Sequence, residues 1–173
     1  MSTFFYMCVI GILLNSAGIA LNSFLLNILG SITICIGAFR LNLEQPIFKK
    51  VKFYSVLAIP FSIVAYALTL IPNMDNPMAV AYIALGINTF FFIYFTYYFT
   101  ESMMDYARSC DELALTRNFR SIWTLCGIIG FLYFMGFNAL ADIFILVGRI
   151  IFLIASVYYC FALNGIAKLF KIK

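Results

Sequence analysis

The composition of the chain excludes most soluble folds. Of its 173 residues, 65% are hydrophobic and only 10% are charged, whereas soluble domains are about 45–50% apolar and about 25% charged. One soluble core of this size could not bury so much apolar surface, so the expected solvent is a lipid bilayer. The net charge is +4, but the basic residues flank apolar runs and form no stretch long enough to follow a phosphate backbone. Nucleic-acid binding is therefore not expected.

The residue types also narrow the chemistry. The chain has no histidine, which removes the commonest general base and the commonest transition-metal ligand. Its five cysteines form no CxxC pair and are expected to be small apolar packing residues. No HExxH, GxSxG or Walker motif occurs. We therefore predict that the protein is not an enzyme, with no catalytic residue, no metal and no cofactor.

The first apolar run is long enough for two helices. Its 39 residues contain no charged side chain. As one helix they would extend about 58 Å, nearly twice a hydrocarbon core of about 30 Å. The polar pair Asn22-Ser23 interrupts the run, which predicts helices over 3–21 and 23–39. No basic residue precedes the run, which favours a retained membrane helix over a cleaved signal peptide.

A charged segment over 40–52 separates this hairpin from the third helix. Within it, Gln45-Pro46 resembles a helix start, because proline is favoured at the first helical position. The part of the third helix that is apolar enough for lipid is predicted over 53–71. Pro60 is expected to bend it locally.

The clearest turn of the chain lies over 72–77, where two prolines bracket Asn and Asp. A fourth helix is predicted over 78–100. It is expected to continue beyond the membrane through Asp105 and Arg108, which are three residues apart and can meet on one helix face.

The remaining two helices follow a second charged loop. Ser109 and Glu112 fit a capping box, with serine as the cap and glutamate three residues later, so a new helix is expected to start there. The membrane parts of the last two helices are predicted over 121–137 and 139–163.

The placement of the basic residues predicts the orientation. Ten of the eleven lysines and arginines fall in the two charged loops or the C-terminal tail, and the short connections near 22, 75 and 138 carry none. Basic loops stay in the cytoplasm, and only an even number of helices keeps all these segments on one side. The sequence thus predicts an all-α integral membrane bundle of six transmembrane helices in three hairpins, with both termini cytoplasmic. We expect one multi-pass domain over 1–173 in an inner or plasma membrane.

The eleventh basic residue, Arg149, lies inside an apolar segment. A charged group at membrane depth costs about 2.5–3.5 kcal/mol on insertion scales, so it is usually functional or paired. Asn138, Asp142, Arg149 and Ser156 follow at steps of four, seven and seven, which places them in one polar stripe on one helix face. Two interpretations remain: Arg149 binds an anionic group of a ligand, or it fixes helix packing through a buried ion pair or through hydrogen bonds.

Small and polar residues elsewhere in the apolar segments predict close helix contacts. Threonines on the fourth helix are expected to bond to their own backbone or to a neighbouring helix. Glycines and asparagines of the first hairpin predict a tight contact with another helix of the chain or with a partner subunit. The residues concerned are Thr89, Thr96 and Thr100 with Asn88 beside them, and Gly11, Asn15, Gly18, Asn22, Asn27 and Gly30.

The leading functional hypothesis is a non-enzymatic membrane subunit that binds a small anionic ligand or a partner membrane protein, as part of a transport system. The four residues of the polar stripe would bind the ligand. A first alternative is a structural or regulatory protein that acts through its cytoplasmic loops, with Glu112 and Arg117 as candidate partner-binding residues. A second alternative is a channel formed by a homo-oligomer, which is less favoured because a continuous polar lining is visible in only one helix.

Overall fold

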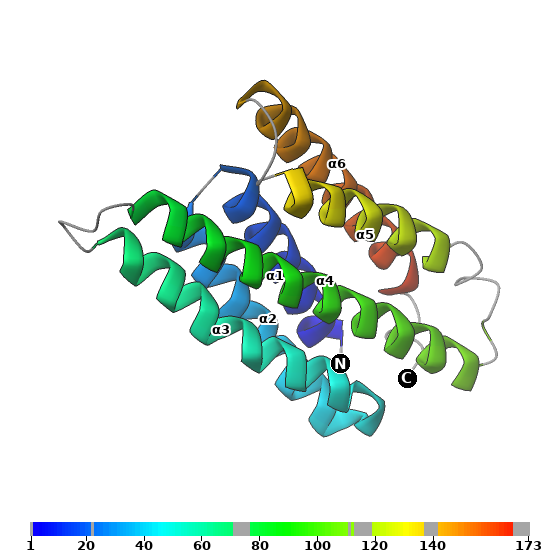
Figure 1. The fold of residues 1–173 in the computed structure, drawn as a ribbon. Helices are drawn as coiled ribbons and strands as arrows, with labels where there is room; N and C mark the ends of the chain where they lie inside the picture. The colour runs from blue at the N-terminus through cyan, green and yellow to red at the C-terminus, as the bar shows by residue number, and fades with distance from the viewer. Residues whose placement is uncertain are drawn as a thin grey trace.

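The computed structural model is all-α (Figure 1). It describes residues 2–21, 23–70, 77–110, 112, 119–136 and 142–167. Within these residues it contains six α-helices and one short 3-10 helix, η1. Their bounds are α1 Ser2–Leu21, α2 Phe24–Glu44, η1 Pro46–Phe48, α3 Lys49–Thr69, α4 Pro77–Ser109, α5 Phe119–Gly136 and α6 Asp142–Ile166.

The first two helices separate where the sequence predicts a fold-back. α1 ends at Leu21 and α2 begins at Phe24. Ser23 caps α2, because its hydroxyl oxygen accepts a hydrogen bond from the backbone N–H of Leu26 at 3.5 Å. Such a cap satisfies one of the N–H groups that a helix start leaves unpaired. α2 then continues to Glu44, beyond the predicted membrane boundary at residue 39.

A proline separates α2 from α3, as the sequence predicts. Gln45 has an extended backbone and its N–H still bonds to the last turn of α2. Pro46 then opens η1, and α3 begins at Lys49 and continues through Pro60. Phe48 is fully buried, so this short linker belongs to the core.

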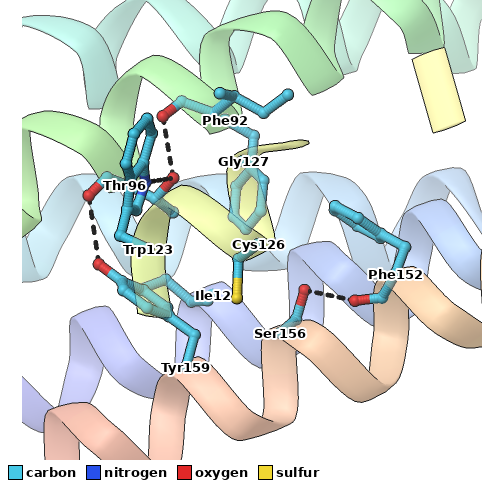
Figure 2. A pocket seen from close by; sticks show the side chains of 10 residues that line it. Ile12, Phe92, Thr96, Trp123, Cys126, Gly127, Phe152, Ser156 and Tyr159 are labelled. Carbon is cyan, nitrogen blue, oxygen red and sulfur yellow. Dashed lines mark hydrogen bonds between the residues drawn. The ribbon is translucent and has the colours of Figure 1, made fainter. Parts of the chain in front are cut away.

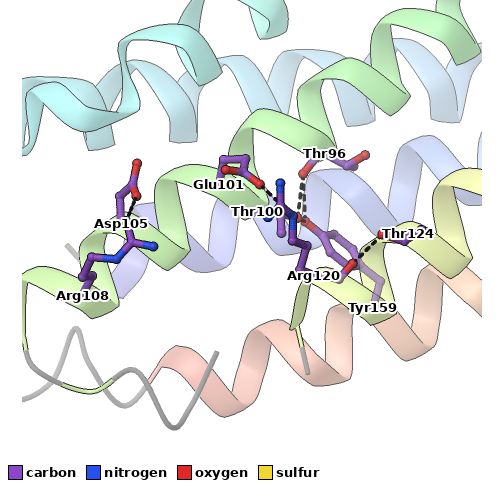
Figure 3. Close-up of polar contacts among 8 residues, drawn as sticks. All are labelled: Thr96, Thr100, Glu101, Asp105, Arg108, Arg120, Thr124 and Tyr159. Atoms are coloured by element: carbon purple, nitrogen blue, oxygen red, sulfur yellow. Dashed lines mark hydrogen bonds and ion pairs between the residues drawn. The ribbon is translucent and has the colours of Figure 1, made fainter. Parts of the chain in front are cut away.

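α4 confirms the predicted extension of the fourth helix. It is continuous from Pro77 to Ser109, a length of 33 residues. Asp105 and Arg108 form the predicted contact, with an N···O distance of 2.9 Å (Figure 3). Both side chains are exposed, so this pair contributes at most about 1 kcal/mol to stability.

The predicted capping box at Ser109 and Glu112 is wrong. Ser109 is the last residue of α4, and its hydroxyl donates to the carbonyl oxygen of Tyr106 at 2.7 Å. The backbone N–H groups of Cys110 and Glu112 both donate to the carbonyl oxygen of Ala107, at 3.1 and 3.0 Å. These bonds close the C-terminus of α4, because they use carbonyl groups that a helix end leaves unpaired.

The helices pack as three antiparallel hairpins, α1–α2, α3–α4 and α5–α6 (Figure 1). Consecutive helices contact each other, and α6 returns to contact α1. The Tyr6 hydroxyl donates to Oδ1 of Asn164 at 3.1 Å, so the start of α1 and the end of α6 lie at the same end of the bundle. Near this end aromatic rings fill the interior, where Phe5 of α1 stacks on Phe99 of α4 with 6.0 Å between ring centroids.

Glycines allow α1 and α2 to touch backbone to backbone. A Cβ atom placed on Gly18 would lie 2.6 Å from the backbone N of Asn27. One placed on Gly30 would lie 2.5 Å from the backbone N of Asn15. Side chains cannot approach a backbone so closely, so only glycine fits these positions. The predicted close contact of the first hairpin is confirmed, and its partner is the neighbouring helix of the same chain.

Within the described part of the chain, three helical segments are long and apolar enough to cross a membrane: Ser2–Leu21, Phe24–Glu44 and Leu146–Ile166. The last of these also exposes large apolar side chains, including Ile154 at 63% and Phe161 at 71%. In a soluble protein these apolar side chains would be exposed to water, which is unfavourable, whereas in a membrane they contact lipid tails. These helices suggest a membrane location, as the composition predicts.

Candidate functional site

α6 carries three of the four residues of the predicted polar stripe, namely Asp142, Arg149 and Ser156. Ser156 is buried and donates to the carbonyl oxygen of Phe152 at 2.9 Å. Arg149, about two turns earlier on the same face, is half-buried, and its Nε atom is buried without a hydrogen-bond partner in the described part of the chain. Asp142 opens α6, but its side chain lies outside the described residues, as does the whole of Asn138.

Ser156 lines a small cavity between α1, α4, α5 and α6 (Figure 2). The cavity has a volume of about 20 Å³, which is room for about one water molecule. Its wall is mainly aromatic and aliphatic, with a few hydroxyl groups. The lining residues are Ile12, Phe92, Ile93, Thr96, Trp123, Cys126, Gly127, Phe152, Ser156 and Tyr159.

The polar groups around the cavity bond to one another and to the backbone. The indole N–H of Trp123 donates to Oγ1 of Thr96 at 3.1 Å. The Tyr159 hydroxyl lies 2.8 Å from Oγ1 of Thr100 and donates to the carbonyl oxygen of Thr96 at 3.2 Å (Figure 3). The threonines of α4 therefore join α5 and α6, as expected of packing contacts. Sequence reasoning did not single out Trp123 or Tyr159, although aromatic residues with one polar atom are typical of such walls.

A second polar group lies between the first two hairpins, and sequence reasoning did not assemble it. Nδ2 of Asn15 donates to Oγ of Ser31 at 2.9 Å and to Oδ1 of Asn27 at 3.2 Å. The same Oδ1 accepts from Oγ of Ser62 at 3.2 Å and from Nδ2 of Asn88 at 2.5 Å. All five side chains are at most 2% exposed. This asparagine cluster joins α1, α2, α3 and α4 through uncharged groups.

The two residues predicted to bind a partner are only partly described. Glu112 is exposed, and Arg117 lies outside the described residues. Nearby, Arg120 of α5 lies 3.5 Å from Glu101 of α4, which links the two helices at the charged end of the bundle (Figure 3). Within the described ranges, no group of three or more His, Cys, Asp or Glu side chains could hold a metal ion.

Comparisons of the chain with models of protein families, with curated proteins and with solved structures find no match.

Proposed function

We propose that this chain is a multi-pass membrane protein with six transmembrane helices and cytoplasmic termini, which binds a small anionic ligand against α6. We further propose that it is a non-enzymatic, transport-associated subunit. The apolar helices, the closed ring of three hairpins and the cavity beside Ser156 support this proposal. The observation that carries it is the state of Arg149, whose Nε atom is buried in an apolar helix without a hydrogen-bond partner among the described residues.

An arginine inside an apolar helix raises the free energy of the folded protein unless an anion or a hydrogen-bond acceptor compensates for the lost hydration. Burial of the Nε–H group of Arg149 without an acceptor removes its hydration and leaves that free-energy cost uncompensated. Arg149 lies three residues before Phe152, which lines the cavity. A ligand with an aromatic body and one carboxylate could place its ring against the cavity wall and its anionic group at Arg149. The cavity admits about one water molecule as it stands, so binding requires the helices around it to move apart.

The single tryptophan of the chain, Trp123, lines the cavity and can report on binding. We expect benzoate to quench its fluorescence in a saturable manner, and benzyl alcohol, which has the same ring without the charge, to bind more weakly. Arg149→Ala should weaken benzoate binding at least about tenfold, because hydrogen bonds to charged groups are worth about 1.5–3 kcal/mol. The measurement is a fluorescence titration of the purified protein.

Arg108→Ala is the matched control, because Arg108 is exposed and pairs with Asp105 at the surface. It should bind benzoate as the wild type does. Gel filtration of the Arg149→Ala protein shows whether it is still folded. Wild-type affinity for benzoate in folded Arg149→Ala protein, or equal affinity for benzoate and benzyl alcohol, would contradict the proposed site.

A further inference from the structure

Aromatic rings and one lysine form a continuous patch on the α3–α4 hairpin. The ring of Tyr54 stacks on Tyr98, with 4.7 Å between centroids and 10° between planes. It also stacks on Tyr94 at 5.7 Å, and Tyr94 contacts Phe90 at 4.7 Å. Nζ of Lys50 lies 5.3 Å from the centroid of the Tyr98 ring. We call these five residues the Tyr54–Tyr98 patch.

The patch is accessible from outside the bundle. Phe90 is 48% exposed and Tyr94 is 39% exposed. Tyr54 and Tyr98 are half-buried, and Lys50 is exposed. The rings of Tyr54 and Tyr98 are stacked face to face, so two phenol groups lie close together. A surface of this kind can receive a molecule without a rearrangement of the core.

The chemical character of the patch changes along the helices. Lys50 and Tyr98 lie towards the charged end of the bundle, and Tyr94 and Phe90 follow along α4 towards its middle. Tyr98 and Phe90 are about 12 Å apart along α4. From the charged end of the bundle towards its middle, the patch therefore presents first a cation, then hydroxyl groups and then an apolar ring. Tyrosine is enriched at the membrane interface for the same reason, since its ring is apolar and its hydroxyl is wet.

Lys50 keeps its charge available to a ligand. The ion pairs found among the described residues join Arg108 to Asp105 and Arg120 to Glu101. Neither Lys49 nor Lys50 takes part in them, and both lysines are exposed. Basic groups at the cytoplasmic surface attract anionic lipids. The order of charge, hydroxyl and apolar surface matches the order of phosphate, ester region and acyl chain in a phospholipid.

We propose that the Tyr54–Tyr98 patch binds one anionic phospholipid of the cytoplasmic leaflet. Lys50 contacts the phosphate, the hydroxyls of Tyr54 and Tyr98 donate hydrogen bonds to the headgroup, and an acyl chain lies over Tyr94 and Phe90. This site is separate from the α6 cavity. It rests on the proposed orientation, in which the charged loops face the cytoplasm.

The test uses the purified full chain with phosphatidylglycerol or phosphatidylcholine added to the detergent solution. Phosphatidylglycerol should raise the melting temperature of the wild type at lower lipid concentration than phosphatidylcholine does. Lys50→Gln should bind phosphatidylglycerol about fivefold more weakly, since one lysine near an anionic surface contributes about that factor. Lys52→Gln is the matched control: it removes the same charge, but Nζ of Lys52 lies 4.4 Å over the ring of Phe39 on α2.

A second variant tests the hydroxyl groups separately from the charge. Tyr54→Phe combined with Tyr98→Phe keeps the stacked rings and should reduce the preference for phosphatidylglycerol. If Lys50→Gln and Lys52→Gln weakened phosphatidylglycerol binding equally, the lipid would be attracted by the overall positive charge and not by this patch, which would overturn the proposal. So would a wild type that does not distinguish the two lipids. Neither result affects the benzoate titration, which uses a soluble anion and a different set of residues.

Discussion

Gly30→Ala is expected to destabilise the bundle by about 1–3 kcal/mol, because one added methyl group would overfill the contact between α1 and α2. The new Cβ atom would lie 2.5 Å from the backbone N of Asn15, 2.9 Å from its Cα and 2.9 Å from the carbonyl oxygen of Gly11. All three are backbone atoms, which no rotamer change can move. The helices would have to separate, and the hydrogen bonds of Asn15 would lengthen with them. Thermal unfolding of the purified protein in detergent measures the effect.

Gly165→Ala is the matched control for this prediction. Gly165 also lies in a long apolar helix, but a Cβ atom placed on it meets nothing within 4 Å. The substitution should leave stability unchanged or raise it by up to about 1 kcal/mol, since alanine favours helix more than glycine does. Equal melting temperatures for the two variants would mean that α1 and α2 are not packed as closely as described.

Asn27→Leu is expected to lower stability by about 1–3 kcal/mol, because it removes the acceptor shared by three buried donors. Oδ1 of Asn27 accepts from Asn15, Ser62 and Asn88. Hydrogen bonds between membrane helices average about 0.6 kcal/mol each, and three of them give a sum in the same range. The effect should appear as weaker attachment of the first hairpin to the second, because the cluster joins the two.

Thr33→Val on the same helix is the control for Asn27→Leu. The Thr33 hydroxyl donates within α2 to the carbonyl oxygen of Leu29 at 2.7 Å, and this bond is exposed. Its loss should change stability by less than about 0.5 kcal/mol. Both variants replace a polar side chain of α2 by an apolar one, so the difference between them isolates the cluster. An Asn27→Leu protein as stable as Thr33→Val would show that the cluster contributes little.

Local patterns predicted the helices well. The break before Ser23, the length of α4 and the contact of Asp105 with Arg108 all depend on neighbours within a few residues. Hydropathy, caps and helical spacing report such features directly. The capping box at Ser109 failed because a serine and a glutamate at that spacing also fit a helix end, where Ser109 bonds backward to Tyr106.

Contacts between distant helices could not be predicted in the same way. Ser31 and Ser62 meet at 3.0 Å although they are far apart in sequence, and neither residue differs locally from an ordinary serine in an apolar helix. The polar stripe placed Ser156 correctly on an inner face of α6. It could not show that Trp123 of α5 and Thr96 of α4 complete the wall, because sequence spacing determines the face of a helix and not its neighbour.

Cysteine labelling from one side of the membrane tests the six-helix orientation most directly. In a background where the other four native cysteines are replaced, the native Cys110 follows α4 at the charged end, and Asp75→Cys places a thiol in the connection before α4. We expect an impermeant maleimide, added to intact cells, to label the thiol introduced at position 75. Cys110 should react only after permeabilisation. Labelling of both thiols from the same side would contradict the proposed orientation.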